Sequence, residues 1–100
     1  MVATRYTVRV GPTAAKHLDK IAGYISQDSP NNAVRFIEEL TEAILSLSHF
    51  PLRCGIAPEG ELRGSVVRQL VYGRYRVLFT VRESEVRVHG IRHASRRPKR

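Results

Sequence analysis

Alternating apolar and polar residues predict a strand near the start of the chain. Between residues 5 and 10, apolar side chains occupy the even positions and polar side chains the odd ones. This is the period of a strand that is buried on one face. Gly11-Pro12 interrupts the alternation, and proline is favoured at the first position of a helix. We therefore expect a short strand that leads directly into a helix at Pro12.

Two stretches with apolar residues at every third or fourth position follow, and each predicts an amphipathic helix. His17 lies among the polar residues of the first stretch, and Ser29-Pro30 opens the second as an N-cap serine followed by proline. Phe50-Pro51 is expected to end the second helix. The short connection predicts an antiparallel helical hairpin. The two stripes are Ala14, Ala15, Leu18, Ile21, Ala22 and Ile25, and then Ala33, Phe36, Ile37, Leu40, Ile44 and Leu47.

Three further strands are predicted in the second half of the chain. Residues 51–64 contain two prolines and three glycines, and we interpret them as a loop. The alternating segments after this loop are separated by tight turns at Tyr72-Gly73 and Glu83-Ser84. The predicted strands cover residues 65–71, 74–82 and 85–93.

The last of these strands contains a break in its alternation. Val86 and Val88 share a face, but Ile91 falls out of phase by one residue, and Gly90 lies between them. A β-bulge at Gly90 restores the phase. It turns Ile91 toward the core and places Arg92 on the opposite face.

These elements predict an α+β fold of two layers, with an N-terminal strand and an α-helical hairpin packed on one face of a mainly antiparallel four-stranded sheet. We expect one domain over residues 1–93 and a frayed basic tail over residues 94–100. The helices are expected to cover Tyr75, Val77, Phe79, Val81, Val86 and Val88. The other face is then expected to carry Arg74, Arg76, Arg87 and Arg92, while Val66 and Val67 leave the orientation of Arg68 open.

Charge separates the last third of the chain from the rest. Residues 1–67 contain seven Lys or Arg and seven Asp or Glu, whereas residues 68–100 contain ten and two, so the net charge of +8 lies in the second segment. Such asymmetry favours a polyanionic partner, namely nucleic acid, a ribosome, a membrane surface or an acidic protein. The alternative is a solvated basic face. We favour a partner, because guanidinium groups on a rigid sheet are well suited to phosphate.

Other sequence features narrow the class of protein. The single cysteine, Cys54, excludes an internal disulfide and fits a reducing cytosol. No segment approaches the ~20 apolar residues of a membrane span, and the first ten residues lack the apolar run of a signal peptide. We therefore expect a cytoplasmic protein. The histidines have no metal-ligand spacing, so we expect no metal. We also expect no cofactor and no small-molecule substrate.

Several motifs occur in a consistent order along nearly the whole chain, and together they resemble the RelE/ParE superfamily of toxins. The resemblance implies the toxin of a type II toxin–antitoxin (plasmid stabilisation) system, which arrests growth and is held inactive by a cognate acidic antitoxin. The motifs are residues 14–25, Ser29-Pro30 with Ala33, Phe36 and Leu40, Leu47 with Phe50-Pro51, Val67-Arg68-Gln69-Leu70, Tyr75-Arg76-Val77-Leu78-Phe79, and Val86-x-Val88-x-x-Ile91-Arg92-His93-x-x-Arg96.

The resemblance leaves the target open. RelE-like members cleave messenger RNA in the ribosome, whereas ParE-like members poison DNA gyrase without being nucleases. Our first expectation is ribosome-dependent, metal-independent RNA cleavage, and gyrase inhibition is the alternative. An inactive relic or a binding module is a third possibility. In each case we expect the basic face to contact the target or the phosphate backbone through Arg68, Arg74, Arg87, Arg92 and Arg96.

Metal-free RNA cleavage needs a base, a cation for the phosphate charge and an acid for the leaving oxygen. YoeB-like members use a glutamate, an arginine and a near-terminal histidine. By resemblance, Glu59, Arg76 and His93 are the candidate catalytic residues, with His93 one position short of the family's histidine. Each has a simpler interpretation. Glu59 could be an ordinary loop carboxylate, Arg76 part of a solvated face or an antitoxin contact, and His93 a cap on a backbone carbonyl.

Overall fold

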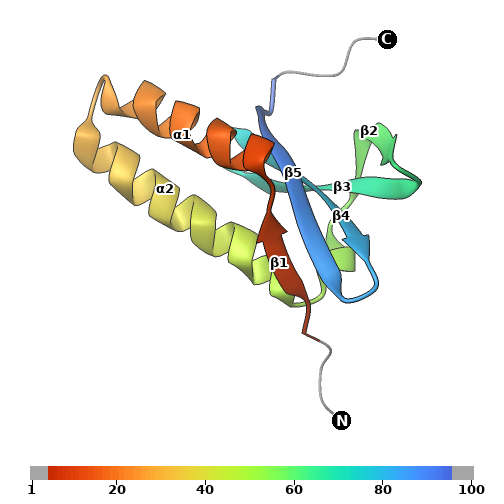
Figure 1. Ribbon diagram of the computed structural model, residues 1–100. Helices are drawn as coiled ribbons and strands as arrows, with labels where there is room; N and C mark the ends of the chain where they lie inside the picture. Colours follow the sequence, from red (N-terminus) through yellow and green to blue (C-terminus); the bar gives the residue numbers. More distant parts are fainter. Residues whose placement is uncertain (1–4, 96–100) are drawn as a thin grey trace.

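The computed structural model describes residues 5–95 and shows two helices packed against a five-stranded sheet (Figure 1). The strand order is β1-β5-β4-β3-β2, in which β1 runs parallel to β5 and the other neighbours are antiparallel. The predicted α+β class and two-layer arrangement are confirmed, with one strand more than predicted. The elements are β1 (Thr7–Val10), α1 (Pro12–Ser26), α2 (Pro30–Leu45), β2 (Ile56–Leu62), β3 (Ser65–Tyr72), β4 (Tyr75–Arg82) and β5 (Glu85–His93).

The helices begin where the sequence signals place them. Pro12 opens α1 after Gly11, which has extended backbone. Ser29 caps α2, since its hydroxyl accepts a hydrogen bond from the backbone N–H of Asn32 at 3.3 Å. The hairpin lies along one side of the sheet (Figure 1). Within residues 5–95, neither helix is long and apolar enough to cross a membrane.

The main core lies between the helical hairpin and the middle of the sheet. Leu40 and Ile44 of α2 pack into the same buried cluster as Phe79 of β4 and Val88 of β5. Burying each such side chain contributes about 1.5–3 kcal/mol. The predicted helix-facing set is confirmed for β4 and β5, because all six of its members belong to this cluster or pack against it.

The predicted bulge in β5 is present. Leu78 pairs with Gly90 and Phe79 pairs with Val88, so His89 is the extra residue. Beyond the bulge, Ile91 is 5% exposed and lies in the main core. Arg92 is paired with Arg76 on the face turned away from the helices.

The interpretation of residues 51–64 as a loop was wrong, because they contain β2. This strand tolerates Pro58 because it lies at the edge of the sheet, and its pairing with β3 is irregular between Ile56 and Glu61. Arg63 and Gly64 both have positive φ and make the turn into β3. A second apolar cluster ties β2, β3 and β4 together and consists of Ala57, Val67 and Leu78.

Candidate functional site

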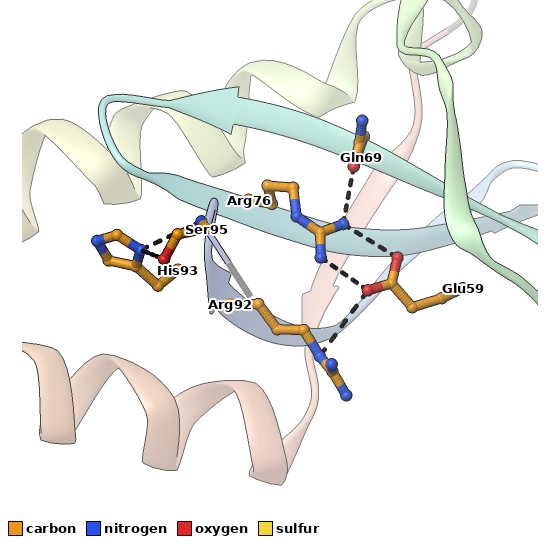
Figure 2. Close-up of polar contacts among 6 residues, drawn as sticks. All are labelled: Glu59, Gln69, Arg76, Arg92, His93 and Ser95. Carbon is orange, nitrogen blue, oxygen red and sulfur yellow. Dashed lines mark hydrogen bonds and ion pairs between the residues drawn. The ribbon is translucent and has the colours of Figure 1, made fainter. Parts of the chain in front are cut away.

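Arg76 is the centre of a polar site on the sheet face opposite the helices. Its Nη1 donates to Glu59 Oε1 at 3.0 Å and its Nη2 donates to Glu59 Oε2 at 2.8 Å. Nη1 also donates to the amide oxygen of Gln69 at 2.8 Å. Strands β4, β2 and β3 contribute one residue each, and Figure 2 shows the guanidinium held between the two partners. This is the planar fork-to-carboxylate geometry that arginine favours.

The Arg76 side chain is 7% exposed and the Glu59 side chain 14%. The hydrogen bonds from Arg76 are the main cause of the lowered pKa of Glu59, and Arg92, with its Nε at 3.9 Å, acts in the same direction. The same bond raises the pKa of Arg76. Both groups are therefore charged at neutral pH and compensate each other. A carboxylate with a lowered pKa is a weak general base.

His93 lies on the other face of the sheet. It pairs with Tyr75, whose ring packs at 5.5 Å from Phe36 of α2, so both residues point to the helix side. The two rings meet edge-on at 5.4 Å. Nδ1 of His93 accepts from the backbone N–H of Ser95 at 3.2 Å and lies 2.7 Å from its hydroxyl oxygen. Figure 2 shows His93 apart from Glu59. The structure thus brings Glu59 and Arg76 together, but not His93.

The predicted basic face is only partly exposed, because Arg76 is buried. Arg92 remains on this face with its side chain 46% exposed. Arg87 is exposed and its Nη2 lies 3.0 Å from Glu85. Arg74 is exposed in the turn between β3 and β4, where its carbonyl accepts from Ala94.

Two of the predicted target-binding residues do not belong to this face. Arg68 pairs with Phe79, so it lies on the helix-covered side of the sheet. Its Nη1 donates to the carbonyl of Cys54 at 2.7 Å, which makes it a structural link between β3 and the loop before β2. Arg96 lies outside the described residues.

Sequence reasoning missed a role for His17, which was expected on the polar side of α1. Its ring is half-buried, and Nδ1 accepts from the backbone N–H of Ile91 at 3.0 Å. A signal was available, since position 17 lies three residues after Ala14 and four before Ile21, beside the apolar stripe. His17 also lines a groove between α1 and the end of β5.

The structure offers little support for metal or thiol chemistry. Within residues 5–95, no three His, Cys, Asp or Glu side chains converge to form a possible metal site. Cys54 is buried, and burial raises the pKa of its thiol, so the reactive thiolate is disfavoured.

The fold and the motifs define a toxin of the RelE/ParE superfamily. The family model described as "ParE toxin of type II toxin-antitoxin system, parDE" matches residues 8–98. The chain therefore belongs to the ParE toxin family of type II toxin–antitoxin systems. Among curated protein sequences, none matches the chain.

Solved structures of other chains share the fold, and two of them are toxin–antitoxin systems. The chromosomal ParDE toxin–antitoxin system from P. aeruginosa superposes with a TM-score of 0.73 at 21% identity, covering 93% of this chain and 100% of that one. The RelBE2 toxin–antitoxin complex from Mycobacterium tuberculosis superposes with a TM-score of 0.64 at 28% identity, covering 92% and 95%.

Proposed function

We propose that this toxin arrests growth by inhibiting DNA gyrase and does not cleave RNA. The observation that carries the proposal is the separation of the three residues expected to catalyse cleavage. A base, a cation and an acid must surround one phosphate. Glu59 and Arg76 instead bind each other on one face of the sheet, and His93 lies on the other. Membership of the ParE family supports the same choice.

The proposal includes a protein partner. We infer that an acidic antitoxin binds this chain and holds it inactive, since both solved relatives are described as toxin–antitoxin systems or complexes. The net charge of +8 favours an acidic partner. Co-expression with the neighbouring small open reading frame is expected to restore growth, and continued arrest would count against this partner.

RNA cleavage is the second candidate function, and one observation favours it. Glu59 and Arg76, which align with two of the three residues of YoeB-like toxins, are in direct contact. The two candidates predict different effects of substituting His93. If His93 is the general acid of RNA cleavage, its removal is expected to lower the cleavage rate about 10²–10⁴-fold.

Two variants and two assays separate the candidates. Wild type, Glu59→Gln and His93→Ala are induced in bacteria, and cleaved DNA–gyrase complexes and messenger RNA ends are followed over time. We expect gyrase complexes or lost supercoiling to precede any fall in translation. Growth arrest is expected to be retained in both variants, provided that thermal unfolding shows each variant to be folded, because Glu59→Gln also removes the ion pair with Arg76. Message cleavage inside ribosomes that disappears in His93→Ala would overturn the gyrase proposal.

A further inference from the structure

A groove of about 880 Å³ lies between α1 and the end of the sheet where β5 finishes. Lys20 and Tyr24 line it from α1, Arg74 from the turn before β4, Tyr75 from the first position of β4, and Arg92 from β5. Among the described residues, the Lys, Arg, Asp and Glu positions that line the groove are all Lys or Arg. Its volume is in the range of ligand-binding sites.

The positive charges of this groove are poorly compensated. Among residues 5–95, Lys20 and Arg74 form no ion pair, and Arg92 reaches only Glu59, at 3.9 Å. Like charges around a concave surface repel one another and concentrate their field in the hollow. An anion in the groove relieves this repulsion, so the site favours an anionic ligand.

Two tyrosines give the groove flat aromatic surfaces beside the cations. Tyr24 is 70% exposed, so the faces of its ring are available for stacking. Tyr75 is held in place by Phe36 on one side and His93 on the other. Aromatic rings that alternate with cations are typical of sites for single-stranded nucleic acid, in which bases stack and phosphates meet Lys or Arg. An acidic peptide would need the cations but not the exposed ring.

The wall of the groove is fixed before any ligand arrives. His17 Nδ1 accepts a hydrogen bond from the backbone N–H of Ile91, and this bond attaches α1 to β5 beneath the lining side chains. Gly90 allows the close approach, because a Cβ there would lie 3.2 Å from His17 Cε1. The backbone segments of α1 and β5 that form the two sides of the groove are thus held together, which lowers the entropic cost of binding.

We propose that this groove binds a single-stranded phosphodiester chain. Lys20 and Arg74 contact phosphates, and the Tyr24 ring stacks on a base. The site goes beyond the proposed function, because binding of the strand by the isolated toxin requires neither gyrase nor the ribosome. It also adds Lys20 and Tyr24, which carry no role in the sheet-face site.

The test is fluorescence anisotropy of the full chain with labelled oligo-dT and oligo-U of about twelve nucleotides, at a series of salt concentrations. Lys20→Ala and Arg74→Ala are each expected to weaken binding and to reduce the salt slope by about 0.7. Tyr24→Ala is expected to weaken binding by about fivefold or more. Arg35→Ala removes an equal charge from an exposed site on α2 outside the groove, and no change is expected.

Each outcome has a definite meaning. Binding of both oligo-dT and oligo-U supports recognition of the phosphate backbone. Binding of only one of them identifies the ligand as DNA or as RNA. An equal loss in Arg35→Ala, or unchanged binding in Tyr24→Ala, would overturn the proposal. So would a polyglutamate competitor that binds in a Lys20-dependent and Tyr24-independent way, because the groove would then be a peptide site. Thermal unfolding of each variant checks that it is folded, and gyrase inhibition is measured separately.

Discussion

Arg76 and Glu59 form a two-pronged ion pair that reaches across three strands. The carboxylate comes from β2, the guanidinium from β4, and the amide of Gln69 on the intervening β3 supports the same nitrogen. The pair therefore fastens the irregular edge strand β2 to the centre of the sheet. In this arrangement, Arg76 is a structural residue that holds the sheet together.

Removing one member of this pair is expected to destabilise the fold. Arg76→Ala leaves the largely buried Glu59 carboxylate and the Gln69 amide oxygen without their hydrogen-bond donor. Breaking a buried ion pair in this way lowers the free energy of unfolding by about 3–5 kcal/mol. Urea unfolding measures this cost. The double variant Arg76→Leu/Glu59→Leu is the control, and it is expected to recover most of the loss. A stable Arg76→Ala protein would contradict a structural role.

Acid is expected to weaken the same contact. Because the pKa of Glu59 is lowered in the folded state, its stabilising contribution is complete above the ordinary value of 4.5 and is lost as the pH falls through the folded pKa. Free energies of unfolding are compared between wild type and Glu59→Gln below pH 4.5. The wild type is expected to lose more stability than the variant, whereas parallel curves would show that the ion pair contributes nothing.

A second pH effect is expected from the bulge residue His89. Burial is the main cause of its lowered pKa, and the charges of Arg87 and Arg63 add to it. The unfolded chain therefore binds the proton first, and the free energy of unfolding falls as the pH drops below 6.5. His89 Nε2 lies 2.8 Å from Thr80 Oγ1, and His89→Gln retains a polar side chain at this position but does not titrate. If the variant shows the same decline in chemical denaturation, another group is responsible.

Gly90 and His17 are expected to be energetically coupled. A Cβ on Gly90 would lie 3.3 Å from His17 Nδ1, so Gly90→Ala is expected to cost about 1–3 kcal/mol through crowding. His17→Ala removes the acceptor of the Ile91 N–H at a cost of about 1–3 kcal/mol. In the double variant the crowding disappears, so its loss of stability is expected to be smaller than the sum of the losses in the two single variants. Strict additivity in this double-mutant cycle would show that the two residues do not interact.

Much of the fold could be predicted because its signals are local. The Ser29 cap and the phase break near Gly90 depend on neighbours in the sequence, and the structure contains both, with His89 rather than Gly90 as the extra residue of the bulge. The strand β2 was missed because Pro58 and Gly60 argue against a strand unless it lies at a sheet edge. Edge position is a property of the whole topology, which the local pattern does not contain.

The candidate site was predictable only in part. Alternation correctly placed Arg76 and Arg92 on one face, but it could not show that β2 would bring Glu59 over that face and bury Arg76. The alternation within a strand also cannot show whether residues of two distant segments lie on the same face of the sheet. For that reason, His93 was grouped by resemblance with two residues from which the sheet separates it.

The parallel pairing of β1 with β5 determines when the toxin can fold during its synthesis. Thr7 pairs with Glu85, so the first strand has no partner in the sheet until β5 has emerged from the ribosome. The core residues Val86, Val88 and Ile91 arrive at the same late stage. A chain whose synthesis stops before β5 therefore lacks these core residues and one wall of the groove. The cell is therefore exposed to the folded toxin only after β5 has been synthesised.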